Sequence, residues 1–361
     1  MYTSKEKLCI FLSMNLPVAS SKLFALESIL VDSDRLLANL VEYKDEIEQI
    51  IDDKQYANLK KQAKLGVDVA VEQATVNGIT CVTYYSDSYP QKLMDIYDPP
   101  MTLFCKGDVS LLDVQSIAVV GTRKISAYGK RVTENFTYAL AHYFCIVSGL
   151  AYGVDAIAHE TALSVKGKTI AVLGGGLNKI YPSAHTWLAD KIVASGGLLV
   201  SEYPPDASSL TYHFPQRNRI VSALSKGVLV CAAPLKSGTF STVEFALDQG
   251  KDVFVVPGEI YDYAYLGSNK LISSMQGAMV TSPDDILNNY GKVFVEKKSA
   301  IQLDINEQLI VNLLESKKLH FNDIVMASQI NPAELNVLLA NLQLCGIVEK
   351  LAGNFYQLWR K

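Results

Sequence analysis

Three short clusters in the sequence combine glycine, hydroxyl and cationic side chains, the residue types that bind phosphate. They are Gly121-Thr122-Arg123-Lys124, Lys236-Ser237-Gly238-Thr239 and Phe214-Pro215-Gln216-Arg217-Asn218-Arg219. Glycine lets the backbone approach a ligand closely, and arginine and lysine neutralise negative charge. Phe214 adds a ring on which a base can stack. The clusters therefore indicate a phosphate-bearing ligand.

The first cluster lies inside a strand, turn, helix and strand pattern that spans Ser116 to Leu150. The apolar run Ile117–Val120 ends at Gly121, a helix with apolar residues at three- to four-residue spacing follows, and a second apolar run ends at Ser148. Such a βαβ unit puts the loop after its first strand at the carboxyl edge of a parallel sheet. A helix begins there, and its free N–H groups and dipole favour an anion.

Apolar runs continue to alternate with helical stretches along the rest of the central segment. We expect strands at Ile117–Val120, Ile146–Ser148, Thr169–Leu173, Leu198–Ser201, Val228–Cys231, Val253–Val256 and Ala278–Thr281. Continuous Val, Ile and Leu runs are typical of strands buried on both faces. The fold class predicted here is therefore α/β, with a central doubly wound, mostly parallel Rossmann-like sheet.

Two more glycine-containing loops follow strands in this pattern, Ser148–Asp155 and Gly174-Gly175-Gly176. A single loop of this kind is often only a turn. Because four such loops follow strands of one sheet, we expect them to form a shared anion-binding groove. Arg217 and Arg219 bracket Asn218 at a helix start and are expected to clamp successive phosphates; the alternative is an arginine pair held in surface salt bridges.

The segments on either side of the sheet have different patterns. The pattern of residues 1–72 predicts a domain of short helices. Residues 78–107 are expected to form a connector that prolines interrupt, with one strand-like stretch at Gly78–Thr83. The sheet domain should span 78–292, and a charged linker at Glu296-Lys297-Lys298 follows it. Residues 303–361 then predict three helices and a hairpin, the order of a winged helix-turn-helix. Its third helix, Asn331–Leu342, has no Lys or Arg, which favours protein contact over DNA reading.

The amino-acid composition excludes some classes of binding partner but does not identify one. The 361 residues carry 33 Lys and Arg against 37 Asp and Glu, a net charge of −4. This balance argues against a uniformly basic coat but permits a local basic groove. The six cysteines are scattered singly, so neither a metal nor a cofactor is expected. No apolar run reaches the length of a membrane span and no signal peptide is recognised, which predicts a cytoplasmic protein without a membrane partner.

The sequence lacks the patterns of common catalytic sites. It has no GxxxxGK[ST] loop, no GxGxxG after the first strand and no GxSxG elbow. We therefore expect a protein that holds phosphates and is not an enzyme. The competing hypothesis is a Rossmann-like enzyme such as a nucleoside-monophosphate phosphoribohydrolase, whose GGxGTxxE signature is matched only in part. Thr242 occupies its acidic position, and Glu244 lies two residues later.

Several runs, in order, resemble the DNA-processing protein A family (DprA, also called Smf): VGTRKISAYGK, SGLAYGVDAIAHETAL, AVLGGGLNKIYPSAH, FPQRNRIVSALS and SGTFSTVEFALDQGKDVFVVPG. The resemblance implies an N-terminal SAM-like domain, a central Rossmann-like domain and a C-terminal winged-helix domain. It further implies single-stranded DNA binding, a homodimer formed through the central domain, and delivery of DNA to the RecA recombinase in natural transformation. Carried over by motif, DNA contacts fall on Gly121, Thr122, Arg123, Phe214, Arg217, Asn218, Arg219, Ser237, Gly238 and Thr239. Lys124 and Lys236 join them on chemical grounds alone.

Overall fold

The structure is a computed structural model that describes residues 2–292, 304–315, 317–344 and 347–358. The chain divides into two compact units, Met1–Phe294 and Val295–Lys361. The helical segment 1–72 and the sheet segment 78–292 belong to the same compact unit, so their treatment as separate domains stays a prediction. The linker expected at Glu296-Lys297-Lys298 lies outside the described residues.

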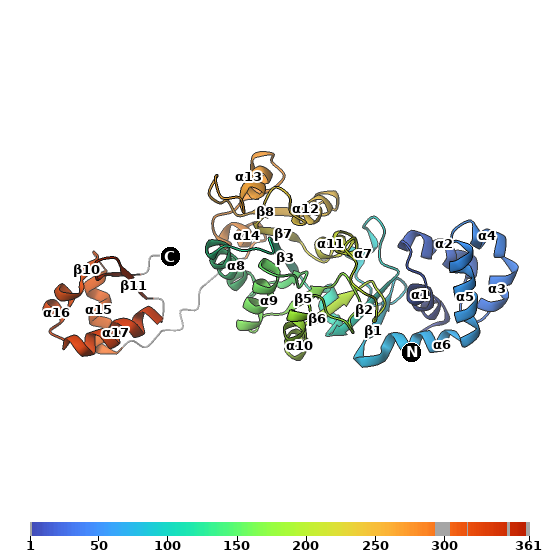
Figure 1. The fold of residues 1–361 in the computed structure, drawn as a ribbon, viewed down its shortest axis with the longest axis horizontal. Coiled ribbons are helices and arrows are strands. Elements are labelled where there is room, and N and C mark those ends of the chain that lie inside the picture. Colours follow the sequence, from blue (N-terminus) through green and yellow to red (C-terminus); the bar gives the residue numbers. More distant parts are fainter. Residues whose placement is uncertain (1, 293–303, 316, 345–346, 359–361) are drawn as a thin grey trace. The chain divides into compact units, whose positions relative to one another are not determined.

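A nine-stranded sheet with the order β1-β2-β6-β5-β4-β3-β7-β8-β9 organises the larger unit (Figure 1). Its strands are β1 (Thr80–Thr83), β2 (Thr102–Gly107), β3 (Ser116–Gly121), β4 (Cys145–Ser148), β5 (Thr169–Val172), β6 (Leu198–Ser201), β7 (Gly227–Ala232), β8 (Asp252–Val255) and β9 (Ala278–Met279). Strands β3 to β9 pair in parallel, whereas β1 and β2 add an antiparallel edge beside β6. This confirms the predicted mostly parallel, doubly wound sheet.

All seven strands expected from the apolar runs are present, and the side chains of β4 to β7 are buried throughout. The strand β2 was missed, because the prolines Pro99 and Pro100 made the whole of 78–107 read as a connector. That prediction is wrong over 102–107. Here Thr102 to Cys105 are buried, and the strand pairs with β1 on one side and β6 on the other.

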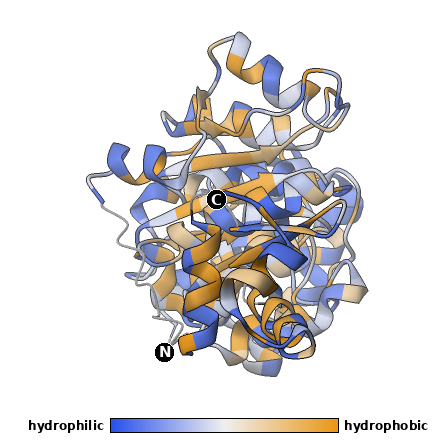
Figure 2. Cartoon of the chain, turned by 90° about the vertical axis from the view of Figure 1, so that its left-hand side faces the viewer, coloured by the Kyte–Doolittle hydropathy of each residue, from blue (hydrophilic) through white to orange (hydrophobic). Residues whose placement is uncertain are grey.

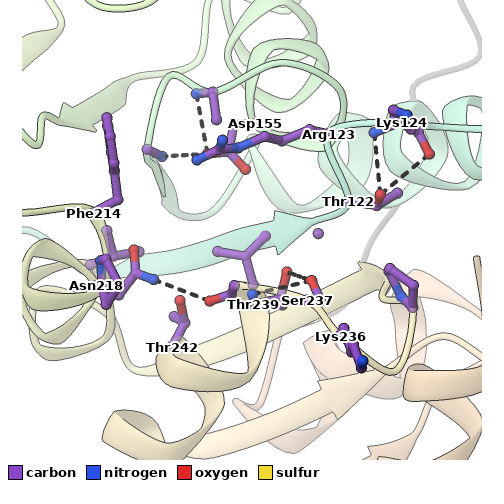
Figure 3. Close-up of a pocket in the computed structure, with 18 of the residues that line it drawn as sticks. Thr122, Arg123, Lys124, Asp155, Phe214, Asn218, Lys236, Ser237, Thr239 and Thr242 are labelled. Carbon is purple, nitrogen blue, oxygen red and sulfur yellow. Dashed lines mark hydrogen bonds between the residues drawn. The ribbon is translucent and has the colours of Figure 1, made fainter. Parts of the chain in front are cut away.

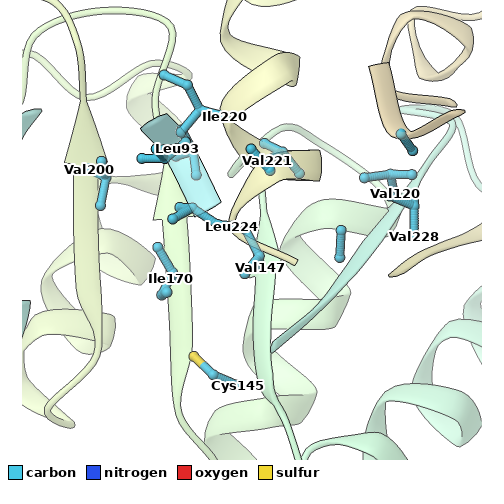
Figure 4. Close-up of a cluster of buried hydrophobic side chains, with 14 of the residues drawn as sticks. Leu93, Val120, Cys145, Val147, Ile170, Val200, Ile220, Val221, Leu224 and Val228 are labelled. Carbon is cyan, nitrogen blue, oxygen red and sulfur yellow. The ribbon is translucent and has the colours of Figure 1, made fainter. Parts of the chain in front are cut away.

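Helices cover both faces of the sheet. They are α7 (Gln91–Met94), α8 (Ala127–Leu140), α9 (Val154–Ser164), α10 (Thr186–Ala194), α11 (His213–Ala223), α12 (Thr239–Asp248), α13 (Leu266–Ser273) and α14 (Pro283–Asn289), with short 3-10 turns η1 (Val76–Gly78), η2 (Val109–Asp113) and η3 (Ser183–His185). Helices α7, α11, α12 and α13 pack on the face that carries Ala118 and Val120 of β3 (Figure 4). Helices α8, α9 and α14 pack on the opposite face, which carries Ile117 and Val119. Alternate residues of β3 thus bury on alternate faces, as strand geometry requires.

The N-terminal part of this unit is helical, as predicted. It contains α1 (Ser4–Asn15), α2 (Ser20–Leu30), α3 (Leu36–Glu42), α4 (Lys44–Glu48), α5 (Asp53–Leu65) and α6 (Val67–Thr75). These helices enclose a core of their own, in which Leu8, Leu26 and Leu59 are fully buried. Most helices carry hydrophilic residues beside hydrophobic ones (Figure 2), as expected for helices with one buried face.

The smaller unit contains the three predicted helices, α15 (Ile305–Leu314), α16 (Phe321–Ser328) and α17 (Pro332–Leu344). Its sheet has the order β10-β12-β11, formed by β10 (Leu319–His320), β11 (Val348–Leu351) and β12 (Phe355–Leu358). The expected hairpin corresponds to β11 and β12, although Gly346, predicted to open it, lies outside the described residues. Strand β10 was not predicted.

Candidate functional site

The order in which the chain adds strands to the sheet reverses between β3 and β7. From β3 the chain adds β4, β5 and β6 on one side, and β7, β8 and β9 then extend the sheet on the other. Two loops therefore leave neighbouring strands and diverge at the carboxyl edge, Thr122–Ser126 into α8 and Ala233–Gly238 into α12. A crevice at such a switch point is the usual ligand site of open α/β sheets.

A cleft of about 590 Å³ opens at this position. Every predicted site residue except Arg219 lines it: Gly121, Thr122, Arg123, Lys124, Phe214, Arg217, Asn218, Lys236, Ser237, Gly238 and Thr239. Thr122, Arg123 and Lys124 lie on one side and Lys236, Ser237 and Thr239 on the other, with Phe214 and Asn218 of α11 at one end (Figure 3). The structure thus brings together three clusters that are far apart in the sequence.

The wall formed by the first cluster is fixed by backbone contacts. Thr122 donates its N–H to the carbonyl of Ala232 at 2.8 Å, which joins the ends of β3 and β7. Its hydroxyl also accepts the N–H of Lys124 at 3.2 Å. Gly153 packs against this turn with φ +76°, and a Cβ there would lie 2.3 Å from the Thr122 carbonyl oxygen. The turn that presents Arg123 and Lys124 is therefore held in one shape, while their side chains are exposed.

The opposite wall is the turn before α12. The Ser237 hydroxyl accepts the N–H of Thr239 at 3.2 Å and donates to the Thr239 hydroxyl at 2.9 Å. Asn218 reaches across from α11 and donates to the carbonyl of Gly238 at 3.3 Å and to the Ser241 hydroxyl at 2.9 Å. Asn218 therefore ties α11 to the start of α12.

Arg217 forms the floor of the cleft and is 4% exposed. Its guanidinium donates to the carbonyl of Gly149 at 2.9 Å and to that of Val172, which tie α11 to the ends of β4 and β5. Burial lowers the pKa of Arg217. Arginine nevertheless stays protonated in proteins, so a fixed positive charge lies beneath the cleft.

Asp155 is the one carboxylate among the described residues that line the cleft. It is buried, and its Oδ2 accepts the N–H groups of Gly149 and Ala151 at 3.1 and 3.3 Å. Burial raises its pKa, against the opposing effect of Arg217. Asp155 thus accepts hydrogen bonds from the loop that precedes α9 and is not presented to a ligand as a free base.

Aromatic rings border the cleft beside the cations. The Arg123 guanidinium lies 5.6 Å from the centroid of the Phe214 ring, within cation–π range. The centroids of the Tyr181 and Phe214 rings lie 5.5 Å apart, and the two ring planes are tilted by 42°. Cationic groups and aromatic faces thus occur together along one groove.

The segment that forms the sheet and the cleft matches a known protein family. The family model described as DNA recombination-mediator protein A matches residues 80–291, more than half of the chain. The chain belongs to the DNA recombination-mediator protein A family. The matched range contains the whole sheet and every residue that lines the cleft.

Relatives and solved structures agree with that assignment. Protein Smf of Escherichia coli is 48% identical over 206 residues, which cover 56% of this chain and 54% of that protein. DNA processing protein DprA of Bacillus subtilis is 44% identical over 212 residues, 58% of this chain and 70% of the relative. The match thus spans about half of the E. coli protein's own length.

Among solved structures, DNA processing protein A of Streptococcus pneumoniae is similar, with a TM-score of 0.61 and 34% identity over 76% of this chain and 98% of that chain. The Helicobacter pylori protein, solved for its single-stranded DNA binding mode, has a TM-score of 0.54 and 33% identity. It covers 60% of this chain and 97% of that one.

Within this family member, Arg219 does not lie where the sequence predicted. It is 6% exposed and forms a bidentate ion pair with Glu202, with N–O distances of 2.7 and 2.6 Å. The Nε–H of Arg219 also donates a hydrogen bond to the backbone carbonyl of Asp98 at 3.1 Å. Arg217 and Arg219 are two residues apart on a helix, a rotation of about 200°. The predicted clamp of both arginines on successive phosphates is therefore wrong for Arg219, which forms a salt bridge that is buried and not, as in the alternative, on the surface.

The third glycine loop also departs from expectation. Gly174, Gly175 and Gly176 do not line the cleft. Cβ atoms added to Gly175 and Gly176 would meet Ser209 at 2.2 Å and the Pro205 carbonyl oxygen at 2.1 Å. These glycines permit close packing against the segment before α11, so the groove involves three of the four loops.

The cleft residues that the sequence did not assign include two tyrosines, Tyr181 and Tyr263. Both are largely exposed, at 52% and 64%. Tyr181 follows the triple glycine, but nothing in its spacing shows that it turns toward Phe214. Across the described ranges, no group of three or more His, Cys, Asp or Glu side chains is placed to hold a metal ion. In the same ranges no helix is both long and apolar enough to cross a membrane.

Proposed function

We propose that the cleft binds single-stranded DNA, and that the protein is a mediator that protects incoming single strands and loads RecA onto them in natural transformation. The observation that carries the DNA-binding part is the meeting of Arg123, Lys124, Lys236 and Arg217 with the Phe214 ring at the switch point. Asp155, the one carboxylate among the described residues that line the cleft, accepts hydrogen bonds from its own loop. Such a groove fits a chain of phosphates with attached bases.

The proposed binding mode follows from the chemistry of each wall. Arg123, Lys124 and Lys236 are exposed and neutralise phosphates, while Thr122 and Ser237 fix the backbone at each side. Phosphate contacts carry no sequence information, so we expect little sequence preference. A base can stack on Phe214 only when it is not paired inside a duplex. Stacking contributes about 1–3 kcal/mol per base, which favours the single strand.

The enzymatic alternative has no support in the cleft. Glu244, the nearest match to the acidic residue of the phosphoribohydrolase signature, is exposed and is not among the residues that line the cleft. Thr242 lines the cleft at the acidic position itself. We therefore propose a binding protein without catalytic activity.

RecA as a partner, a homodimer formed through the central unit, and a cytoplasmic location are proposed from the family alone. The H. pylori relative named for its single-stranded DNA binding mode supports the DNA ligand. In the smaller unit, which we propose is a winged-helix domain, α17 carries Glu334 and neither Lys nor Arg. We propose that this helix contacts protein rather than DNA.

A fluorescence anisotropy titration tests the proposal. Labelled oligothymidylate is titrated with the full chain, with a duplex of equal length and free nucleoside monophosphates as competitors. We expect saturable binding that excess unlabelled single strand reverses and monophosphates do not. Release of free base from the monophosphates would instead establish the enzymatic alternative.

A further inference from the structure

A second cavity of about 610 Å³ lies in the same compact unit and shares no lining residue with the cleft. Its walls come from the α1–α2 loop, the segment before β2, and the segment between β6 and α11. Its lining residues include the aromatic side chains Tyr97, Tyr203, Tyr212 and His213 and the ion pair of Arg219 with Glu202. We propose that this cavity receives a nucleobase of the strand held in the cleft, an inference that rests on the proposed function.

Helix α11 is the partition between the two cavities. Phe214, Arg217 and Asn218 line the cleft. His213, Gln216 and Arg219 line the second cavity. The second set recurs every three residues, which places it on one face of the helix. The cavities are thus separated by about the diameter of one helix, roughly 10–12 Å, a distance that one strand can bridge.

The second cavity presents aromatic faces. The Tyr203 and His213 rings are stacked with centroids 3.8 Å apart and planes 19° apart. Tyr212 and Tyr97 are 59% and 94% exposed at its border. A flat ring is the ligand that stacks on such faces, and every nucleobase has one.

Its charge distribution fits a base and not a phosphate. Arg219 is the one Lys or Arg among the described residues that line it, and Glu202 and Asp98 both pair with that guanidinium, so this wall offers no free positive charge to a phosphate. Burial lowers the pKa of His213, which keeps this ring neutral near pH 7. Asn15, Ser208 and Gln216 add uncharged hydrogen-bonding groups to the wall. An uncharged ring edged with donors and acceptors matches this set.

The route between the cavities passes the start of α11. Thr211 lines the cleft and Tyr212 the second cavity, so adjacent residues border both. The helix begins at His213 without a side-chain cap, and the positive end of its dipole favours a phosphate there. A strand crossing this point would place a phosphate at the helix start and a base on each side.

The test compares the full chain with the double variant Tyr97→Ala/Tyr212→Ala, using oligothymidylates of about 6 and about 16 nucleotides. Both residues are exposed, so the fold should persist, as a thermal melt would show. We expect the variant to bind the long strand about 5- to 150-fold more weakly, the value of one stacked base. Its affinity for the short strand, which fills only the cleft, should stay within about twofold of wild type. Tyr138→Ala, on α8 and lining neither cavity, is the matched control.

Two results would overturn the inference and leave the proposed function standing. One is an unchanged affinity of the double variant for the long strand. The other is an equal loss for both lengths, which would assign the tyrosines to the cleft or to the fold. Failure of the wild-type chain to bind either strand would overturn the proposed function itself. In a supporting measurement, 2-aminopurine placed along the long strand should change its fluorescence at one position in wild type but not in the double variant.

Discussion

Arg217 and Arg219 stand two residues apart on α11, yet their guanidiniums lie in different cavities. Arg217 donates to the carbonyls of Gly149 and Val172 beneath the cleft, whereas Arg219 pairs with Glu202 beside the N-terminal helices. One helix thus uses two arginines for separate purposes. Arg217 provides fixed charge under the proposed DNA path, and Arg219 provides stability.

Replacing Arg219 should destabilise the fold. Arg219→Met leaves the Glu202 carboxylate, whose side chain is 13% exposed, without its partner. Breaking a buried pair from one side costs about 3–5 kcal/mol, and urea unfolding followed by circular dichroism would measure the loss. The double variant Arg219→Met/Glu202→Leu should recover much of it. An unchanged unfolding free energy in the single variant would show that the pair is not buried in solution.

Replacing Arg123 should weaken DNA binding without weakening the fold. Its side chain is exposed and lines the cleft. For single strands, log K falls with log salt by about 0.7 per phosphate neutralised. Arg123→Ala should therefore reduce the slope of a salt-dependent anisotropy series by about 0.7, with an unchanged melting temperature. Arg35→Ala, also exposed but outside the cleft, is the control and should keep the wild-type slope. Equal slopes for both variants would remove Arg123 from the DNA path.

Two glycines near the cleft should respond differently to alanine. Gly153 has φ +76°, and a Cβ would lie 2.3 Å from the Thr122 carbonyl oxygen. Gly238 has φ −62° and open space around the Cβ position. Gly153→Ala should lower the unfolding free energy by about 1–3 kcal/mol through strain and overpacking, and Gly238→Ala should not. Chemical denaturation of the two variants side by side checks this, and similar stabilities would refute the fixed turn.

Buried His159 should make the fold sensitive to acid. The Thr169 hydroxyl donates to the carbonyl of Ile146, so it accepts from Nδ1–H of His159, and Nε2 is left as a buried acceptor with no partner among the described residues. Burial lowers the pKa of His159 to about 3, with Arg217 adding to the shift. Below pH 6.5 the unfolded chain takes up a proton that the folded chain resists, so stability falls as pH falls toward 3.

The slope of that loss reaches at most about 1.4 kcal/mol per pH unit. His159→Met lacks the titrating ring, so its unfolding free energy should fall less steeply over the same range. The difference between wild type and variant, measured by urea unfolding at several pH values, isolates the histidine from the carboxylates. Parallel curves would show that this imidazole is hydrated in the folded state.

Much of the sheet is readable in the sequence because its strands are buried on both faces. Runs such as Ile117–Val120 and Val228–Cys231 contain no polar interruption, and the loops that follow them must meet at one edge. Strand β2 was not predicted because Pro99 and Pro100 precede it and because its partners, β1 and β6, are not adjacent to it in the chain. The sequence shows where proline residues interrupt regular structure, but it does not show which distant strands pair with each other.

The site was predicted less completely than the sheet, for a geometric reason. Glycine, hydroxyl and cationic clusters identified the loops, but the side on which each α11 residue points depends on where that helix packs. In the sequence, Arg219 and Arg217 are therefore equally good candidates for a phosphate contact. Only the structure shows that Arg219 faces Glu202, on the side of the helix away from the cleft. Tyr181 likewise reaches the cleft through tertiary packing against Phe214.

Phe214→Ala tests the central claim most directly, through the affinity of labelled oligothymidylate at a fixed salt concentration. The ring is half-buried at one end of the cleft, and Arg123 lies over it. Loss of one stacked base should weaken binding about 5- to 150-fold and leave the salt slope near its wild-type value, because no phosphate contact is removed. Wild-type affinity in a folded Phe214→Ala variant would contradict the account, since no base would then stack on Phe214 in the cleft.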